Sequence, residues 1–301
     1  MKVTILLSTY NGAKYLKEQL ESLYLQTYKN FDIIVRDDGS SDESYNILRS
    51  YPVYILPSSK ENVGVIKSFS LLLEYALQNT TSDFFMFCDQ DDIWKKDKIE
   101  KMLLKIKESG YTQISKPVLI HSDLEIVNSN LNTIHRSFFQ YNKLNPTKNR
   151  LNYLLMQNII TGCSLMINRE LAQIAAPIPN SAIMHDWWLG LVACKFGRII
   201  CLNESLVKYR QHNNNTIGVQ KLTLGYLFDI LFQKNFLRNN ILQAKAYLDI
   251  YRDKLDIEDI EMLEDFIALE KESFFKRREI LWKYGLFKQG ILRNIVLFIK
   301  V

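Results

Sequence analysis

The sequence FFMFCDQDDIW, residues 84–94, places three carboxylates directly after a short apolar run. Four consecutive apolar residues at positions 84–87 predict a strand that is buried on both faces of a sheet. Asp89, Asp91 and Asp92 would then lie at its carboxyl end, where open α/β sheets bind their ligands. Clustered carboxylates repel one another, so the pattern favours a divalent cation that takes oxygen ligands and contacts phosphate.

A solvated turn followed by a helix cap would also explain these acids, because Asp is common in both places. We prefer the metal site because the carboxylates follow an apolar strand and lead into Ile93 and Trp94. The stretch therefore predicts a metal site at the carboxyl end of a central strand.

The composition is that of an ordinary soluble protein, with 47% hydrophobic and 24% charged residues among 301. This length predicts one large α/β domain with an appendage, or two domains. No apolar run approaches the ~18 residues needed to span a membrane, and the apolar N-terminal segment is too short for a signal peptide. The cysteines are not closely paired and have apolar neighbours, which indicates reduced thiols in a cytoplasmic protein. They are Cys88, Cys163, Cys194 and Cys201.

Strands and helices alternate through the first part of the chain. Amphipathic helices separate strands that are expected at residues 3–7, 31–35, 53–56 and 84–87. Ser40 and Glu43 have the spacing of a capping box for the second helix. The alternation predicts an α/β fold with a mostly parallel central sheet that is covered by helices on both faces.

The second part of the chain is less regular. Further strands are expected at residues 118–120, 158–167 and 205–210, with a polar excursion over residues 124–150. His121 and His135 are interpreted as structural rather than catalytic. Beyond residue 221 helices are expected at residues 222–232, 237–251 and 257–275, followed by a basic, aromatic tail.

Polar loops follow the first three strands. Residues 9–12 offer hydroxyls and backbone amides, Asp37 and Asp38 offer acceptors, and Asn62 with Gly64 offers an amide and a close backbone approach. An acid at a strand end suits a pyrimidine N3–H or a ribose hydroxyl, and no Gly-rich phosphate motif is present, so phosphate would contact a metal. For Asp37 and Asp38 a turn followed by a cap is the alternative.

Several spaced motifs together resemble the family 2 glycosyltransferases of the GT-A fold. They are Ser8-Thr9-Tyr10-Asn11, Arg36-Asp37-Asp38-Gly39-Ser40, Glu61-Asn62-Val63-Gly64 and Asp89-Gln90-Asp91-Asp92. Residues 88–94, CDQDDIW, are similar to the rhamnosyltransferases that build bacterial cell-wall and capsular polysaccharides. The resemblance covers roughly the first 215 residues and is more specific than a single Asp-x-Asp pair.

The resemblance implies an inverting, metal-dependent transfer from a nucleoside diphosphate sugar. Asp37 or Asp38 would contact the nucleobase, Asp89 would lie near the ribose and diphosphate, and Asp91 would bind Mg²⁺ or Mn²⁺. The other donor-binding residues that it implies are Thr9, Tyr10, Asn11, Asn62, Gly64, Lys67, Gln90 and Arg210. It assigns no role to Asp92. The Gln-x-x-Arg-Trp pattern of processive synthases is missing, so we expect one sugar per encounter.

A further acid, Asp186, opens an expected helix in the sequence His-Asp-Trp-Trp. Asp186 is a suitable N-cap, but two neighbouring indoles would exclude water, raise its proton affinity and offer aromatic faces to a sugar. Its position matches that of the family's general base, which takes the proton from the acceptor hydroxyl. We therefore expect Asp186 to be the base, and Gly162, Trp187 and Trp188 to contact the acceptor.

The strand expected at residues 205–210 ends in Arg210, which His212 and a polar loop at residues 213–218 follow. In the enzymes that this chain resembles, a histidine here can join the metal, and an arginine suits a leaving diphosphate. An exposed histidine at a strand end is the alternative for His212. The loop has the composition of a lid over the donor.

The formal net charge of +5 is concentrated at the C-terminal end. Residues 271–301 carry eight Lys or Arg and two Glu, whereas the preceding residues carry 30 basic and 31 acidic groups. Aromatic and basic residues are intermixed there, which suits a helix on an anionic membrane surface or a helix that packs on the catalytic domain. Nucleic-acid binding is not favoured because the rest of the chain has no basic excess.

These observations predict a catalytic domain over residues 1–218, with a nucleotide-sugar half at 1–123 and an acceptor half at 124–218, and a helical region at 219–301. The expected reaction moves one sugar, L-rhamnose from dTDP-rhamnose, to a glycan on a polyprenyl diphosphate carrier. The enzyme would be cytoplasmic and peripheral on the inner face of the bacterial plasma membrane. A UDP-hexose donor and a non-catalytic nucleotide- or sugar-binding module are the alternatives.

Overall fold

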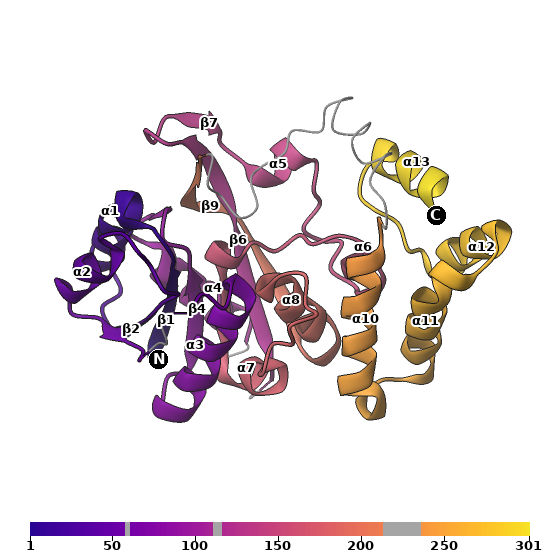
Figure 1. The fold of residues 1–301 in the computed structure, drawn as a ribbon, viewed down its shortest axis with the longest axis horizontal. Helices are drawn as coiled ribbons and strands as arrows, with labels where there is room; N and C mark the ends of the chain where they lie inside the picture. The colour runs from indigo at the N-terminus through magenta and orange to yellow at the C-terminus, as the bar shows by residue number, and fades with distance from the viewer. Residues whose placement is uncertain (58–60, 111–115, 213–235) are drawn as a thin grey trace.

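A computed structural model describes residues 1–57, 61–110, 116–212 and 236–301. In these ranges, helices lie on both faces of one mixed sheet, and a group of helices follows at the C-terminal side (Figure 1). The nine described strands form the order β3-β2-β1-β4-β8-β6-β9-β5, with β7 paired to β6. The helix expected at residues 222–232 and the loop expected at 213–218 lie outside the described residues.

The element bounds are as follows. The strands are β1 (Val3–Thr9), β2 (Phe31–Asp37), β3 (Tyr54–Ile55), β4 (Phe84–Cys88), β5 (Ile93–Trp94), β6 (Val118–Asn128), β7 (Thr133–His135), β8 (Leu165–Asn168) and β9 (Arg198–Gln211). The helices around the sheet are α1 (Ala13–Tyr24), α2 (Ser44–Arg49), α3 (Val65–Asn79), α4 (Lys98–Glu108), α5 (Phe138–Asn142), α6 (Leu151–Met156), α7 (Arg169–Ala175) and α8 (His185–Phe196), with the 3₁₀ turn η1 (Gly162–Ser164). The C-terminal helices are α10 (Arg238–Tyr251), α11 (Ile257–Ala268), α12 (Phe274–Tyr284) and α13 (Ile291–Lys300), with the 3₁₀ turns η2 (Arg252–Lys254) and η3 (Leu269–Lys271).

The first four strands pair in parallel, so their carboxyl ends meet at one edge of the sheet. The expectation of a parallel sheet holds for this half. The second half is mixed, because β8 runs antiparallel to both β4 and β6, while β6 and β9 pair in parallel. The polar loops after β1, β2 and β4 are thereby brought together.

Strand β4 is buried on both faces, which confirms the prediction for the apolar run. Phe85 and Phe87 pack in the hydrophobic cluster that includes α3 and α8, whereas Met86 and Cys88 pack in the cluster that includes α1 and α4. The acidic turn therefore begins from the centre of the sheet, where little backbone movement is tolerated.

Two elements differ from the sequence prediction. Strand β6 extends into the first residues of the expected polar excursion and ends at Asn128, because apolar residues beyond the irregular pairing at Asp123 continue the ladder with β9. Of the strand expected at residues 158–167, only the last part forms, as β8 from Leu165 onward. Before β8, the Asn158 side chain accepts a hydrogen bond from the Ile160 N–H at 3.0 Å, and residues 162–164 form η1. A local side-chain hydrogen bond thus takes the place of strand pairing at Ile160.

Helix boundaries differ as well. Ser40 does not cap α2, because its hydroxyl donates to Asp37, and α2 begins at Ser44 with Glu43 as its N-cap. The helix expected at residues 257–275 is interrupted before α12, where the Ser273 side chain accepts from the Lys276 N–H as an N-cap.

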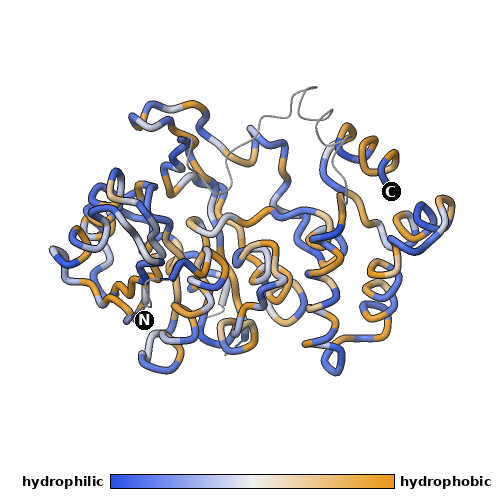
Figure 2. The backbone as a smooth tube through the Cα atoms, in the orientation of Figure 1, coloured by the Kyte–Doolittle hydropathy of each residue, from blue (hydrophilic) through white to orange (hydrophobic). Residues whose placement is uncertain are grey.

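The C-terminal helices pack through α10 on the helices that cover the sheet. Tyr247 of α10 places its ring 5.8 Å from the Trp188 ring of α8 and donates a hydrogen bond from its hydroxyl to the Leu191 carbonyl at 3.1 Å. Buried residues of α11, α12 and α13 continue the same hydrophobic cluster. Among the described residues, no helix has both the length and the apolar composition to cross a membrane. The hydropathy of the chain is shown in Figure 2.

Candidate active site

Gln90 joins the acidic turn to the loop after β1. Its Oε1 accepts hydrogen bonds from Thr9 Oγ1 at 2.6 Å and from the Tyr10 N–H at 2.8 Å, and its Nε2 donates to the Tyr10 carbonyl at 3.1 Å. A Cβ at Gly12 would lie 2.1 Å from Gln90 Oε1, so this approach requires glycine. The predicted donor-binding residue Gln90 thus directs its amide to the protein, where it positions the first loop.

The loop after β1 is also tied to the loop after β2. The Asn11 N–H donates to Ser40 Oγ at 2.9 Å, and Asn11 Oδ1 accepts from the Ser41 N–H at 2.8 Å. Asn11 has a φ of 47°, a left-handed conformation that asparagine tolerates better than most residues. Asn11 therefore holds two predicted donor-binding loops in register.

Asp37 and Asp38 are both buried, and their carboxylates hold neighbouring loops. Asp37 accepts from the Ser40 N–H at 3.0 Å and from Ser40 Oγ at 2.5 Å. Asp38 forms an ion pair with Arg36 and accepts from the N–H groups of Val63 and Gly64, both at 2.9 Å. The Asp38 carboxylate therefore contacts protein donors at both oxygens, which differs from the open acceptor expected for a nucleobase.

Asp38 fixes the start of α3. Gly64, the residue before α3, has a φ of 83°, which favours glycine, and Asn62 Oδ1 also accepts from its N–H at 3.0 Å. Lys67 follows in the first turn of α3, where it is half-buried. The residues predicted from Asn62 to Lys67 thus lie at the same edge of the sheet as the acidic turn.

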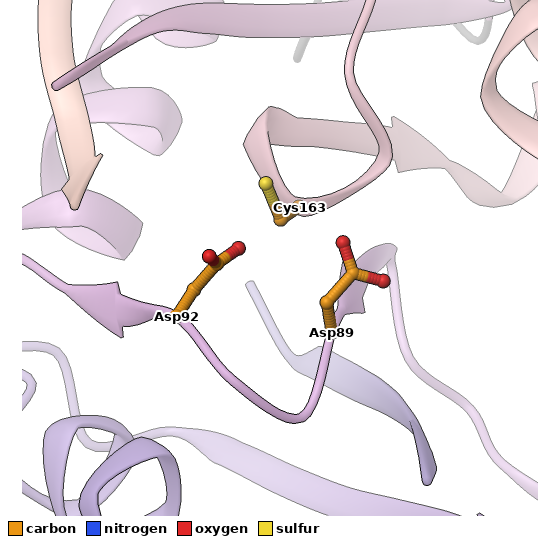
Figure 3. A group of neighbouring side chains, drawn as sticks. All are labelled: Asp89, Asp92 and Cys163. Atoms are coloured by element: carbon orange, nitrogen blue, oxygen red, sulfur yellow. The ribbon is translucent and has the colours of Figure 1, made fainter. Parts of the chain in front are cut away.

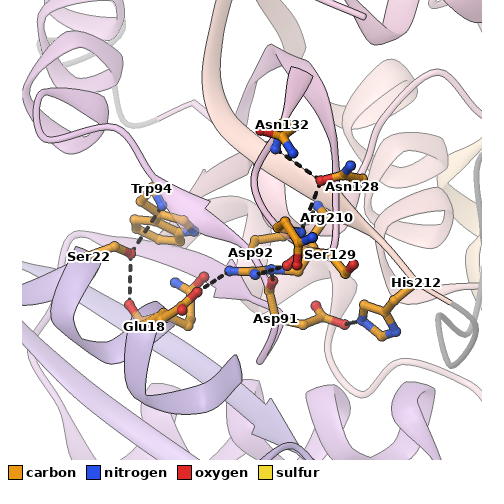
Figure 4. Close-up of polar contacts among 12 residues, drawn as sticks. Glu18, Ser22, Asp91, Asp92, Trp94, Asn128, Ser129, Asn132, Arg210 and His212 are labelled. Atoms are coloured by element: carbon orange, nitrogen blue, oxygen red, sulfur yellow. Dashed lines mark hydrogen bonds and ion pairs between the residues drawn. The ribbon is translucent and has the colours of Figure 1, made fainter. Parts of the chain in front are cut away.

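Asp91 and His212 are in contact. His212 Nε2 lies 2.8 Å from Asp91 Oδ2, and the His212 ring packs 4.8 Å from the ring of Tyr15 on α1 (Figure 4). The two predicted metal ligands come from residues 121 positions apart and meet at the end of the parallel edge. A carboxylate oxygen and an imidazole nitrogen side by side are a suitable start for a divalent-ion site.

Arg210 is buried beside this pair, and its guanidinium contacts protein groups. Its side chain is 2% exposed and contacts Glu18, the Asp91 carbonyl through Nε at 2.7 Å, and the Ser129 carbonyl at 2.8 Å (Figure 4). Its backbone N–H donates to Asp92 Oδ1 at 3.0 Å. The prediction of Arg210 as a diphosphate ligand is therefore corrected: its guanidinium supports the acidic turn from the protein side.

Asp89, Asp92 and Cys163 form an inner cluster in which one ligand-type atom from each residue lies within 4.8 Å of the others (Figure 3). Burial, followed by the charge of Asp91, raises the pKa of Asp92 to about 7. Desolvation and the charges of Asp92, Asp91 and Asp186 raise the pKa of Asp89 well above its usual value. In the described part of the chain, Asp92 Oδ2 has no hydrogen-bond partner.

Lys98 is the cation beside this inner cluster, and the sequence reading missed it. The side chain is fully buried, donates from Nζ to the Cys163 carbonyl at 2.5 Å, and lies over the Trp94 ring at 3.2 Å from its centroid. Burial lowers the pKa of Lys98 to about 7, and the nearby thiols and acids oppose that shift. A signal was present, because Lys98 stands four residues before Met102 on the buried stripe of α4.

Asp186 lies in the first turn of α8 and is buried. Met184 is the N-cap of this helix, so the alternative of Asp186 as a simple cap is not observed. Asp186 Oδ2 accepts from the Gly162 N–H at 2.7 Å and Oδ1 accepts from Asn158 Nδ2 at 3.0 Å. Burial raises the pKa of Asp186 to about 7, although these hydrogen bonds oppose the shift. The group can therefore exchange a proton near neutral pH.

Gly162 makes room for a protein side chain instead of a sugar. A Cβ at Gly162 would lie 2.4 Å from His185 Nε2, so the imidazole occupies the space that we assigned to the acceptor. His185 packs between the rings of Phe69 and Phe87, and burial lowers its pKa to about 3. His185 is thus a neutral packing residue next to the candidate base.

The two tryptophans face protein as well. Trp188 is fully buried against α10, and its indole N–H donates to the Ala175 carbonyl at 3.1 Å, which corrects its prediction as an acceptor contact. Trp187 is half-buried and donates to the Leu154 carbonyl at 2.5 Å. His121, interpreted as structural, is buried in β6 against Phe139.

Sequence comparison identifies relatives of this chain. The model of glycosyl transferase family 2 matches residues 4–173. The uncharacterized glycosyltransferase RT0329 of Rickettsia typhi is 28% identical over 218 residues, which cover 71% of this chain and 65% of that protein. The dTDP-rhamnosyl transferase RfbG of Shigella flexneri is 28% identical over 258 residues, which cover 80% of each protein. The chain thus spans slightly less than two thirds of RT0329.

Solved structures share the fold at low identity. TarS of S. aureus, residues 1–349 in complex with UDP-GlcNAc, has a TM-score of 0.57 at 15% identity and covers 95% of this chain and 93% of that chain. The mannosyltransferase PcManGT of Pyrobaculum calidifontis, in complex with GDP-Man and Mn²⁺, has a TM-score of 0.51 at 17% identity and covers 95% of this chain and 86% of that chain. These likenesses confirm the predicted GT-A fold.

Proposed function

Because this chain belongs to glycosyltransferase family 2, we propose that it moves one sugar from a nucleoside diphosphate donor to a glycan hydroxyl, with inversion at the anomeric carbon. The buried carboxylate of Asp186 carries this proposal. Its pKa is raised to about 7, and its charge is among those that raise the pKa of Asp89 in the acidic turn. A proton acceptor therefore lies within electrostatic reach of the edge where the donor-binding loops meet.

The chain's own residues supply orientation and proton transfer. As the acceptor oxygen bonds to the anomeric carbon and the bond to the diphosphate breaks, the Asp186 carboxylate takes the hydroxyl proton. The Gly162 N–H and the Asn158 amide hold that carboxylate in place. Attack opposite the leaving group accounts for inversion.

Asp91 and His212 are the residues that would hold a divalent ion, Mg²⁺ or Mn²⁺. Their adjacent oxygen and nitrogen atoms fit such an ion, and the turn carries further acids in Asp89 and Asp92. A bound ion would neutralise charge on the departing diphosphate. The Mn²⁺ in the PcManGT structure supports this choice.

The donor that we propose is dTDP-rhamnose. The similarity to RfbG over most of both chains supports it, as does the CDQDDIW sequence of the acidic turn. A UDP-hexose is the second candidate, because TarS, which has the same fold, was solved with UDP-GlcNAc. A thermal-shift comparison of dTDP-rhamnose, UDP-glucose and UDP-GlcNAc discriminates them, since the donor that binds raises the melting temperature by mass action.

The acceptor that we propose is a growing cell-surface glycan on a polyprenyl diphosphate, reached at the cytoplasmic face of the bacterial plasma membrane. The basic C-terminal region supports this location, because anionic lipids attract clustered Lys and Arg.

Donor turnover tests the enzymatic proposal against a non-catalytic binding module. Wild type should hydrolyse or transfer donor faster with Mn²⁺ than with chelator, and Asp91→Ala should lose that stimulation and bind Mn²⁺ more weakly. Asp186→Asn should retain donor binding but transfer at least about a hundredfold more slowly, because a positioned base contributes on that order. Asp32→Asn, exposed on β2, is the matched control. Donor binding with no turnover in wild type would support the binding module instead.

A further inference from the structure

Helix α13 presents an apolar stripe to solvent. Ile291, Ile295 and Ile299 recur every four residues, so they share one face of the helix, and they are 81%, 50% and 63% exposed. The other side of α13 is already packed, with Val296 and Leu297 buried. Folding of the described chain therefore uses one face of α13 and leaves a second apolar face uncovered.

Helix α12 adds aromatic side chains to this surface. Phe274, Phe275 and Trp282 are 59%, 82% and 68% exposed. The Trp282 ring lies 5.9 Å from the Phe298 ring of α13, and Arg278 donates to the Phe298 carbonyl, so the two helices are joined. We call the exposed set the C-terminal apolar face, defined as Phe274, Phe275, Trp282, Ile291, Ile295 and Ile299.

Basic residues accompany this face. Residues 271–301 carry eight Lys or Arg and two Glu. Lys276 and Lys283 are 46% and 51% exposed and form surface ion pairs with Glu279 at 2.9 Å and with Asp265 at 3.2 Å, so the excess of positive charge belongs to the region as a whole. Moving exposed isoleucine and aromatic side chains out of water lowers the free energy. The basic residues of this region are attracted to anionic groups. Both needs are met together at the surface of an anionic bilayer, where tryptophan and phenylalanine also favour the interface.

We propose that the C-terminal apolar face inserts shallowly into an anionic membrane surface, with α12 and α13 lying on the bilayer. The ten residues of α13 would extend about 15 Å, roughly half of a hydrocarbon core, so the helix lies on the surface rather than across it. The use of this contact rests on the proposed function, because it would hold the active site next to a lipid-carried glycan.

Vesicle binding by the full chain tests this surface. The probes are vesicles of phosphatidylcholine alone and of phosphatidylcholine mixed in equal parts with phosphatidylglycerol, measured by co-sedimentation. The triple variant Ile291→Ser, Ile295→Ser, Ile299→Ser should bind the anionic vesicles on the order of a hundredfold more weakly. Ile257→Ser is the matched control, because Ile257 is 74% exposed but lies outside the face, and its binding should equal that of wild type. Added salt should weaken wild-type binding.

A second variant, Lys276→Gln with Lys283→Gln, keeps the apolar face and removes two exposed positive charges without placing a like charge beside Glu279 or Asp265. It should lose at least about tenfold in binding to anionic vesicles and little on phosphatidylcholine. Equal binding by wild type and the isoleucine variant would overturn the proposal, as would a shift of that variant from oligomer to monomer with vesicle binding unchanged. Donor turnover in vesicle-free buffer separates the two proposals, because the variants should keep wild-type turnover whatever their membrane affinity.

Discussion

The raised pKa of Asp186 leads to two expectations for Asp186→Asn. The variant should lose transfer activity, and its unfolding free energy should fall less than that of the wild type as the pH rises. The unfolded chain releases this proton near the ordinary value of 3.8, whereas the folded protein holds it until about pH 7. Between these values the folded state binds the extra proton, so its stability falls as the pH rises. Asp186→Asn removes this loss but also removes the base.

The size of the effect follows from the two pKa values. From pH 5 to pH 8 the wild type should lose roughly 3 kcal/mol that Asp186→Asn does not lose, because about two units of that interval lie below the folded pKa at 1.36 kcal/mol each. Replacing a carboxylate that accepts from both Gly162 and Asn158 has its own cost. That cost is nearly the same at both pH values and cancels in the comparison.

Urea unfolding of wild type and Asp186→Asn at pH 5 and pH 8 measures this difference, and the wild-type rate of transfer should rise as the pH passes about 7. Asp32→Asn controls for the loss of an exposed carboxylate. If the difference in unfolding free energy between wild type and Asp186→Asn is the same at both pH values, Asp186 is ionised in the folded state and the reasoning fails.

Three further predictions concern the neighbouring groups. Lys98→Met and Asp92→Asn should each destabilise the fold, but the double variant should recover about 1–3 kcal/mol relative to their sum, because each single variant removes a charge whose attraction offsets the burial of the other. Additive unfolding free energies would contradict this electrostatic interaction between the two side chains. Gly162→Ala should cost about 1–3 kcal/mol, since its Cβ would lie 2.4 Å from an imidazole nitrogen, and an unchanged melting temperature would show that the imidazole moves freely. Asn158→Ala removes a hydrogen bond that lowers the pKa of Asp186, so the pH–rate profile should shift to higher pH; an unshifted profile would exclude Asp186 as the titrating base.

The sequence predicted those features that depend on local pattern. The alternation of apolar runs and polar loops identified β1, β2 and β4 and placed Asp89 and Asp91 at the end of a buried strand. The spacing of whole motifs identified the family. The resemblance to that family suggested His212 as a second metal ligand beside Asp91, and the structure brings the two side chains into contact. The strands and the family could be inferred from local pattern and motif spacing alone, whereas the contact between Asp91 and His212 is visible only in the folded chain.

The sequence could not show how side chains from separate segments share space. Gly162 was assigned to a sugar because nothing in its neighbourhood showed that His185 fills the same volume. Arg210 was assigned to a diphosphate because its contacts with Glu18, Asp91 and Ser129 come from three other segments. Trp188 was expected at the acceptor, but it packs against Tyr247 of α10. That helix is distant from Trp188 in sequence and meets it only in the folded chain.

The packing of α10 against α8 affects where this protein can be divided. The region shared with the family model ends at residue 173, before the helix that carries Asp186. A recombinant fragment that stopped after His212 would contain the proposed base and both proposed metal ligands, yet it would expose the Trp188 indole to water. The region that the family model covers is therefore shorter than the unit that must fold, and anyone who trims or fuses this chain should keep α10 with the part that carries Asp186.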